Sequence, residues 1–411
     1  MAATLQDVLG LYFSIPFCRG KCTYCNFASG VYPASDHARY VDRLLGGMEK
    51  TAKWAEQMRV HLPRKVDTIY FGGGTPVLLE AELFARIFAA IRAGFAVDAD
   101  AEITVECAPG QLSDAVLEAL VAAGVNRVSL GVQSFVDREA QLSGRFHTRA
   151  IVLEDVRRLR AAGITNINID LLAGLADQTL ASWRESLNVL LDSGIPHASV
   201  YMLEIDEDSR LGRELIAGGA RFSAGLVPND DAIAQMYETA VEALNTAGLA
   251  QYEISNFAKP GSQSKHNLRY WQRRPYLGLG LDASSMLCSA DEDSILRTSI
   301  TDDLNEYLGS DEIPLETAWL GPTQQLEEAW FLGLRRNAGV NMTELDTEFG
   351  AEALAPAGAV VRRLAEDELV IVDGQTVSLT PRGRLISNDV FAEFLGLSPT
   401  MQRERQAAAV R

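Results

Sequence analysis

The chain has 411 residues, five of them cysteine, and a formal net charge of −18 from 37 basic and 55 acidic side chains. Hydrophobic residues make up 47% of it and charged residues 22%, which is typical of a globular protein and excludes a largely disordered chain. The excess of acidic side chains repels phosphate groups, which argues against general nucleic-acid binding. The sequence has no apolar run of 18 residues and no secretory signal, so we expect a cytoplasmic protein without a membrane-spanning helix.

From residue 11 to about residue 252 the chain alternates short apolar segments with longer amphipathic ones. Helical patterns cover 35–58 and 113–123, and Gly124 follows the second as a C-cap. Strands alternating with helices predict an α/β fold whose parallel sheet is closed or partly closed into a barrel, with its chemistry at the C-terminal ends of the strands. The predicted strands are Leu11–Ile15, Val66–Phe71, Glu102–Glu106, Val125–Leu130, Asn166–Leu171 and Ala198–Leu203.

After this barrel region, residues 1–258, the pattern changes twice. Residues 259–315 are less periodic and rich in Gly, Ser and Asp, and they predict a connector that wraps the barrel. Residues 316–399 predict a winged-helix-like module, and their 13 acidic against 6 basic residues favour a protein-facing or lid role over DNA binding. Residues 400–411 predict a frayed tail. The module is predicted from helices at Gln324–Arg335 and Glu352–Glu366, a hairpin at Leu369–Leu379 around Asp373-Gly374, and a closing helix at Pro381–Leu395 begun by Thr380.

Three of the five cysteines fall within eight residues, in the spacing C-x3-C-x2-C: Cys18, Cys22 and Cys25. In a reducing compartment such spacing indicates metal binding or catalysis, whereas the isolated Cys107 and Cys288 are expected to pack as small apolar residues. A structural zinc site needs a fourth ligand; position 27 is Phe27, and His37, the remaining candidate, falls within a predicted helix. Three thiolates on a [4Fe–4S] cluster instead leave one iron open for an exchangeable ligand, so the pattern favours chemistry.

Three further features fit a ligand site but also have ordinary structural explanations. The glycine run 72–74 allows close approach of backbone to a ligand, although turns use glycine freely. Glu106 ends a strand where a ribose hydroxyl or an ammonium group can use its carboxylate, although it can equally be solvated. His266 stands beside Tyr270 and Trp271, a combination suited to haem, although a hydrogen-bonded structural histidine is the alternative.

The stretch from Tyr12 to Cys25, YFSIPFCRGKCTYC, resembles the cluster loop of radical S-adenosylmethionine (SAM) proteins. The resemblance implies a partial (β/α) barrel, and a [4Fe–4S] cluster held by the three cysteines whose open iron is chelated by the amino and carboxylate groups of SAM. It also implies that the glycine run meets the amino group of the methionine moiety.

Residues 127–135, 144–148 and 169–175 extend the match to the subgroup that contains oxygen-independent coproporphyrinogen III dehydrogenase and the haem chaperone HemW. The resemblance runs to about residue 394, which implies a HemN-type C-terminal domain. It also implies two SAM sites. The first takes Tyr12, Gly73 and Glu106, and the second takes Gly74, Thr75, Gln133, Arg145 and Asp170.

Within the subgroup, the sequence favours the haem chaperone. Phe27 replaces the fourth cysteine typical of the dehydrogenase, and only about ten residues precede the first strand. The residues from His266 to Trp271 match the H-N-x-x-Y-W signature of the chaperone, which implies that His266, Tyr270 and Trp271 bind haem. We therefore expect haem to be bound and transferred to acceptor haemoproteins, with the cluster and SAM setting conformation or homodimer formation. The alternative is a radical SAM oxidoreductase that acts on a tetrapyrrole.

Overall fold

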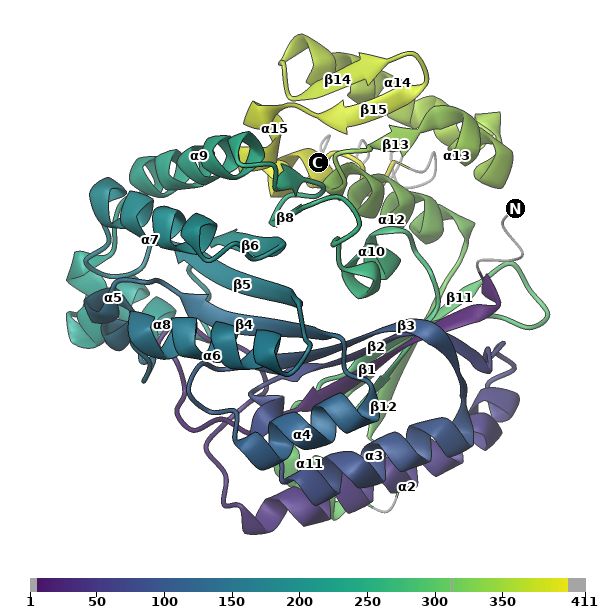
Figure 1. Ribbon diagram of the computed structural model, residues 1–411. Helices are drawn as coiled ribbons and strands as arrows, with labels where there is room; N and C mark the ends of the chain where they lie inside the picture. Colours follow the sequence, from purple (N-terminus) through teal and green to yellow (C-terminus); the bar gives the residue numbers. More distant parts are fainter. Residues whose placement is uncertain (1–5, 311, 313, 398–411) are drawn as a thin grey trace.

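The computed structural model describes residues 6–310, 312 and 314–397. Six parallel strands, each adjacent to the next in the chain, form the middle of its main sheet (Figure 1). All six contain the predicted segments or most of them, which confirms the α/β fold. They are β1 (Val8–Ile15), β2 (Lys65–Gly73), β3 (Ala96–Cys107), β4 (Arg127–Gln133), β5 (Asn166–Ala173) and β6 (His197–Met202).

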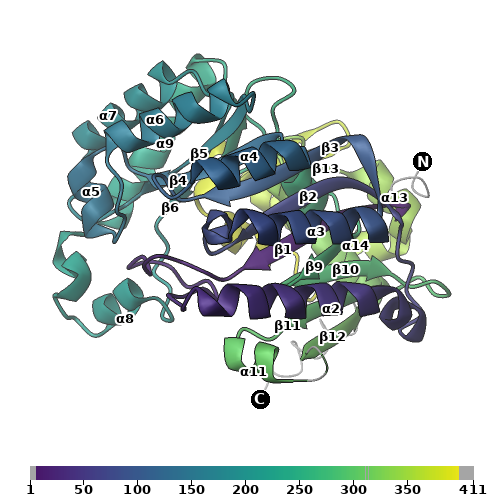
Figure 2. The same ribbon diagram turned by 60° about the horizontal axis from the view of Figure 1, so that its bottom comes forward.

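Helices cover the outer side of this sheet, as Figures 1 and 2 show. Ser113 caps one of them by accepting a hydrogen bond from the N–H of Val116, and Gly124 ends it at φ +88°, as expected. The elements between β1 and β7 are α2 (Ser35–Gln57), η1 (Pro76–Leu78), α3 (Ala81–Gly94), α4 (Asp114–Ala123), α5 (Asp137–Leu142), α6 (Arg149–Ala161), α7 (Leu180–Asp192), α8 (Arg210–Ile216), η2 (Arg221–Leu226) and α9 (Asp230–Thr246).

Residues 250–320 extend the sheet at both ends, which the sequence did not predict. β9 pairs parallel with β1, and β10 to β12 continue antiparallel from it, while β8 and β7 follow β6. The order of the twelve strands places β12 and β7 at opposite ends, so the barrel is partial, as predicted. The added elements are β7 (Ala250–Gln251), β8 (Asn256–Ala258), α10 (Lys265–Trp271), β9 (Tyr276–Leu279), β10 (Ser284–Cys288), β11 (Ile295–Ile300), α11 (Leu304–Gly309) and β12 (Leu315–Leu320).

The C-terminal residues form a separate small sheet, β13–β15–β14, packed with helices around the stacked rings of Trp330 and Phe394. Thr380 caps the helix after the hairpin, as predicted, but the single closing helix is wrong, because Ile386 leaves helical geometry and splits it in two. The tail predicted at 400–411 lies outside the described residues. The elements are α12 (Pro322–Arg335), β13 (Val340–Asn341), α13 (Met342–Phe349), α14 (Ala351–Glu366), β14 (Val370–Asp373), β15 (Thr376–Leu379), α15 (Pro381–Leu385) and α16 (Ser387–Ala392).

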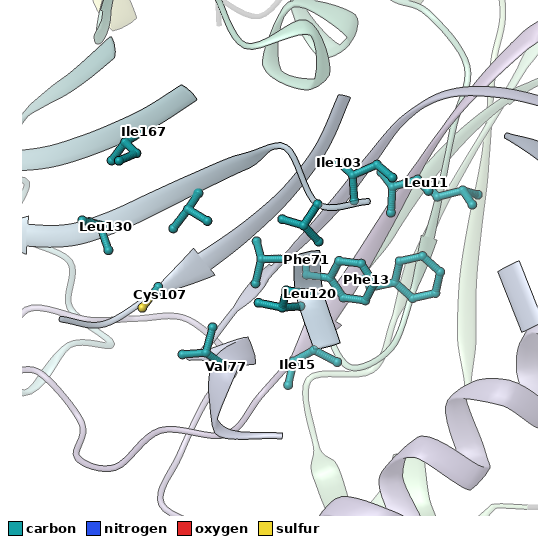
Figure 3. Packing of buried hydrophobic residues seen from close by; sticks show 14 of the residues in the cluster. Leu11, Phe13, Ile15, Phe71, Val77, Ile103, Cys107, Leu120, Leu130 and Ile167 are labelled. Atoms are coloured by element: carbon teal, nitrogen blue, oxygen red, sulfur yellow. The ribbon is translucent and has the colours of Figure 1, made fainter. Parts of the chain in front are cut away.

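The two faces of the main sheet differ in polarity. Leu11, Phe13 and Phe71 point into the apolar layer beneath the helices, where the rings of Phe13 and Phe71 stack 4.9 Å apart (Figure 3). Because side chains alternate along a strand, Tyr12 and Tyr70 point to the opposite, concave face. Because apolar and polar side chains alternate along these strands, the concave face of the sheet, which is the interior of the partial barrel, is polar. Among the described residues, no helix combines the length and apolarity needed to cross a membrane.

Candidate functional site

A cavity of about 820 Å³ lies at the C-terminal ends of the parallel strands, where the barrel prediction placed the chemistry. Ten of the eleven residues predicted for the cluster and for SAM line it. Tyr12 does not, but its ring lies 6.1 Å from that of Tyr70 on the concave face. The ten are Cys18, Cys22, Cys25, Gly73, Gly74, Thr75, Glu106, Gln133, Arg145 and Asp170.

The cysteine loop is held at two points by backbone hydrogen bonds, one at Cys18 and one at Thr23, between the second and third cysteines. The N–H of Cys18 donates to the carbonyl of Gly30 at 2.8 Å, and the N–H of Thr23 donates to the carbonyl of Ser143 at 3.0 Å. All three cysteines are partly buried free thiols, and Thr75 Oγ1 lies 3.9 Å from Cys18 Sγ. The chain itself therefore holds the three thiols at one wall of the cavity.

The donor set fits a cluster better than a single zinc ion. No three His, Cys, Asp or Glu side chains of the described residues are grouped as a site for one metal ion. His37, the candidate fourth ligand, instead has its Nδ1 3.2 Å from a carboxylate oxygen of Glu80 and its ring 4.2 Å from that of Phe17. A [4Fe–4S] cluster takes its thiolates on separate irons, so they need not converge on one point.

The glycine run is joined to the cysteine loop by its backbone. Gly74 N–H donates to the carbonyl of Ile15 at 2.9 Å, and Thr75 N–H donates to that of Phe17 at 2.7 Å. A Cβ on Gly74 would lie 2.7 Å from the Phe17 carbonyl oxygen, and Gly73 has φ +97°, so neither position readily takes a side chain. The run thus brings bare backbone to the cavity wall beside the thiols.

Glu106 is the carboxylate nearest the glycine run. Tyr70 donates a hydrogen bond to its Oε1 at 2.8 Å. Burial raises the pKa of Glu106 to about 7, nearby Asp170 adds to this effect, and the Tyr70 hydroxyl and Arg145 oppose it. Near neutral pH this carboxyl group can therefore change between its neutral and its charged form.

Arg145, Gln133 and Asp170 also line the cavity, and Arg145 and Asp170 lie close enough to Glu106 to affect its pKa. A Cβ on Gly131 would lie 3.2 Å from a guanidinium nitrogen of Arg145 and 3.4 Å from Gln133 Nε2, so these two side chains pass over that glycine. Gln133 adopts φ +69°, a conformation that is costly for a residue with a side chain and is often kept at binding sites. Asp170 accepts hydrogen bonds from Asn168 at 2.7 Å and from Ser129 at 3.3 Å.

Arg145 keeps unused hydrogen-bonding capacity. Its terminal Nη2 donates to the hydroxyl of Tyr24 at 3.1 Å, but its buried Nε has no partner among the described residues. A buried donor without a partner is costly unless a ligand completes it. Together with the two carboxylates, this guanidinium gives the cavity both signs of charge, which suits a zwitterionic or polyhydroxylated ligand.

Part of the cavity wall comes from residues that the sequence did not predict. Arg335 and residues 385–389, all from the C-terminal module, line it together with Tyr201 and Ser255. Residues 385–389 reach the cavity at the break between α15 and α16, and the prediction of one unbroken helix hid that feature. Tyr24 and Tyr70 were missed as well: Tyr24 stands inside the cysteine motif at a position that was given no role, and Tyr70 belongs to no recognisable motif.

The three predicted haem residues do not line the cavity. His266 lies in α10 and is fully buried, with Nδ1 3.0 Å from Thr68 Oγ1 and Nε2 2.8 Å from the Tyr270 hydroxyl. Burial lowers the pKa of His266 to about 3, so its ring is neutral at pH 7. The Trp271 ring is covered by the Arg335 guanidinium at 4.3 Å. In this conformation both imidazole nitrogens are occupied, and haem ligation by His266 stays a prediction.

Comparison with known proteins gives matches along nearly the whole chain. The profile of the radical SAM superfamily matches residues 12–190, and that of the HemN C-terminal domain matches residues 320–386. The chain is 33% identical over 393 residues to "Heme chaperone HemW" of Lactococcus lactis, covering 95% of this chain and 98% of the relative. It is 34% identical over 390 residues to "Heme chaperone HemW" of Bacillus subtilis, covering 94% and 98%.

A solved structure shows the same fold. That of coproporphyrinogen III oxidase (HemN) from Escherichia coli, a radical SAM enzyme, superimposes with a TM-score of 0.80 at 23% sequence identity, covering 95% of this chain and 90% of that one. At this identity the likeness establishes the architecture alone.

Proposed function

Because the chain belongs to the HemW family of the radical SAM superfamily, we propose that it is a haem chaperone, which binds haem and transfers it to acceptor haemoproteins. The observation that carries the proposal is the match to relatives named heme chaperone, at 33% and 34% identity over almost the full length of each. A cytoplasmic location and a homodimer, both expected from the sequence, belong to the same proposal.

The proposal includes a [4Fe–4S] cluster on Cys18, Cys22 and Cys25. When bound, it supplies a redox-active iron site with one position open to an exchangeable ligand. The protein's own contribution is to hold the three thiols at the cavity wall and to bring the bare backbone of Gly73 and Gly74 beside them.

SAM is the proposed nucleotide ligand of the cavity. The carboxylates of Glu106 and Asp170 are placed to accept hydrogen bonds from ribose hydroxyls or from the ammonium group, and Arg145 can donate to the ligand carboxylate. The volume of about 820 Å³ lies in the upper part of the range common for small-molecule sites and leaves room for a second SAM beside the first, as the two predicted residue sets require.

We expect SAM binding by the reconstituted protein to weaken as the pH falls through about 7. The ammonium and hydroxyl donors of the ligand favour ionised Glu106, and its raised pKa means that acidification protonates this carboxylate at nearly neutral pH. Isothermal titration calorimetry between pH 6 and pH 9 measures the effect. In Glu106→Gln the affinity should be lower than in wild type and nearly independent of pH; an unchanged wild-type slope in this variant would contradict the assignment.

For haem, the proposal keeps His266 as the iron ligand and requires α10 to open. Ligation needs Nε2 to leave the Tyr270 hydroxyl and the buried ring to become accessible. α10 has only seven residues, and its opening must break the hydrogen bonds of its N-terminus to Glu102 and the ion pair of Arg269 with Asp67.

Haemin titration of the full chain tests both the function and the ligand. His266→Ala should weaken haem binding at least tenfold and shift the Soret band, because the axial nitrogen is lost. Tyr270→Phe keeps the ring but frees Nε2, so it should bind haem at least as tightly as wild type. Wild-type haem binding by His266→Ala would overturn the ligand assignment, and decarboxylation of coproporphyrinogen III by the reconstituted protein would overturn the chaperone proposal.

A further inference from the structure

The helix α10, which carries the H-N-x-x-Y-W residues, lies against the concave face of the main sheet (Figure 1). Its N-terminus is held by Glu102 of β3, whose carboxylate accepts hydrogen bonds from the N–H groups of Lys265 at 3.0 Å and His266 at 2.9 Å. Negative charge at a helix N-terminus is favourable, and here the carboxylate is buried. The helix is therefore tied to the strands that also carry the pocket residues.

One chain of contacts leads from α10 to Glu106 through Tyr70. The ring of Tyr70 stacks on that of His266, with centroids 5.2 Å apart, and the Tyr70 hydroxyl donates to Glu106 at 2.8 Å. Tyr12 stacks beside both rings, 6.1 Å from Tyr70 and 6.4 Å from His266. Tyr70 thus touches the motif helix with its ring and the pocket carboxylate with its hydroxyl.

A second chain of hydrogen bonds leads from α10 to Asp170. The N–H of Ser264, the N-cap of α10, donates to the Tyr252 hydroxyl at 3.2 Å. That hydroxyl lies 2.9 Å from His197 Nε2, and His197 Nδ1 lies 2.6 Å from Asn168 Oδ1. Asn168 in turn donates to Asp170 at 2.7 Å. Both pocket carboxylates are therefore linked to the same helix.

The backbone of β2 is adapted to the pair of Tyr70 and Glu106. Gly72 stands two residues after Tyr70, and a Cβ there would lie 3.0 Å from Tyr70 Cε1 and 3.1 Å from Glu106 Oε1. A side chain at this position would crowd both partners at once. The glycine thus leaves the space in which the hydroxyl and the carboxylate meet.

We propose that Tyr70 is a positioning residue of the nucleotide pocket, which holds Glu106 in place for its ligand and couples occupation of the pocket to the stability of α10. The proposal rests on the proposed function in taking SAM as the ligand. SAM molecules that donate to Glu106 in the first site and to Asp170 in the second fix the far ends of both chains of contacts, so they stabilise α10 in its buried position. By reciprocity, release of α10 weakens nucleotide binding.

This coupling gives a direction to haem transfer. If His266 binds haem only when α10 opens, SAM and haem favour opposite positions of the helix. SAM binding then weakens haem binding and promotes release to an acceptor, while haem loading lowers the affinity for SAM by the same factor.

Hydrogen exchange and SAM titration of the cluster-reconstituted full chain, without haem, test the proposal. In wild type, saturating SAM should slow amide exchange over 265–271 at least threefold. Tyr70→Phe keeps the ring but loses the bond to the carboxylate, so SAM should bind about tenfold more weakly and protect α10 less than half as much. Tyr40→Phe is the control: Tyr40 is fully buried and Tyr70 partly buried, but the Tyr40 hydroxyl bonds Ser14 and Leu281 instead of a pocket carboxylate.

A pH series separates positioning from loss of structure. Without its hydroxyl donor, Glu106 should ionise at higher pH, so the SAM affinity of Tyr70→Phe should recover between pH 8 and pH 9, which a merely destabilised variant would not do. The charged and titratable side chains that face Glu106 are Tyr12 (β1), Tyr70 (β2), Arg145 (the loop after α5), Asp170 (β5), Tyr201 (β6) and Tyr270 (α10).

Two results would overturn the proposal: wild-type SAM affinity in Tyr70→Phe, or α10 exchange that does not respond to SAM in wild type. The haemin titration is independent of both. If the protein shows the coupling but binds no haem, this proposal stands and the chaperone function is contradicted. If it binds haem but shows no coupling, the chaperone function stands and this proposal is contradicted.

Discussion

Replacing Cys18 with serine is expected to abolish the brown absorbance that anaerobic reconstitution with iron and sulfide produces in the wild-type chain. The thiol is one of three at the cavity wall, and a cubane that already lacks a fourth protein ligand has no spare thiolate. Iron analysis should fall from about four per chain to a small residual fraction. Cys22→Ser and Cys25→Ser should behave in the same way.

Cys288→Ser is the matched control for this experiment. Cys288 is also a partly buried free thiol, but it lies in β10 and does not line the cavity. It should assemble a full cluster. A Cys18→Ser chain that keeps the wild-type spectrum would remove the cluster from the proposal. A wild-type chain that takes up one zinc ion and no iron would restore the structural zinc alternative.

The six central strands could be predicted because apolar residues recur in each of them, either in a run or at every second position, and a helix follows each strand. β9 and β12 could not. β9 has only four residues, of the sequence YLGL, and β12 is mostly exposed, so its conformation depends on pairing with β11 rather than on its own pattern. The break between α15 and α16 could not be predicted either, because the residue at the break is Ile386 and not a helix-breaking Gly or Pro.

The site residues likewise divide into those that a sequence motif identifies and those that only the fold brings together. Residues in contiguous motifs, such as Cys18 and Gly74, could be assigned because a loop and a strand end carry them into the cavity together. Tyr70 could not, because only the pairing of β2 with β3 and the fold of α10 bring it to Glu106 and His266. Sequence spacing likewise could not show that His266 is buried with both ring nitrogens occupied, since its partners include Thr68, almost 200 residues away.

Replacing Arg269 with methionine is expected to lower the free energy of unfolding by about 3–5 kcal/mol, because two backbone carbonyls lose their donor, at about 1–3 kcal/mol each, and an ion pair is lost as well. This arginine stands inside the H-N-x-x-Y-W segment and is fully buried. It forms an ion pair with Asp67 and donates to the carbonyls of Val8 at 3.0 Å and Pro275 at 2.8 Å. Burial lowers its pKa to about 10, so the side chain is still charged at pH 7.

Arg274→Met is the control that isolates burial, because Arg274 pairs with the same carboxylate of Asp67 at 3.0 Å while keeping a partly exposed side chain. Arg274→Met should lower the free energy of unfolding by only about 1 kcal/mol. Urea unfolding of the chain without haem, followed by circular dichroism, measures both variants. Equal losses would mean that the ion pair with Asp67 explains the effect and that the backbone contacts add nothing. The expected difference would instead show that Arg269 joins α10 to β1 and to Pro275, just before β9, so that part of the H-N-x-x-Y-W segment serves the fold before any haem is bound.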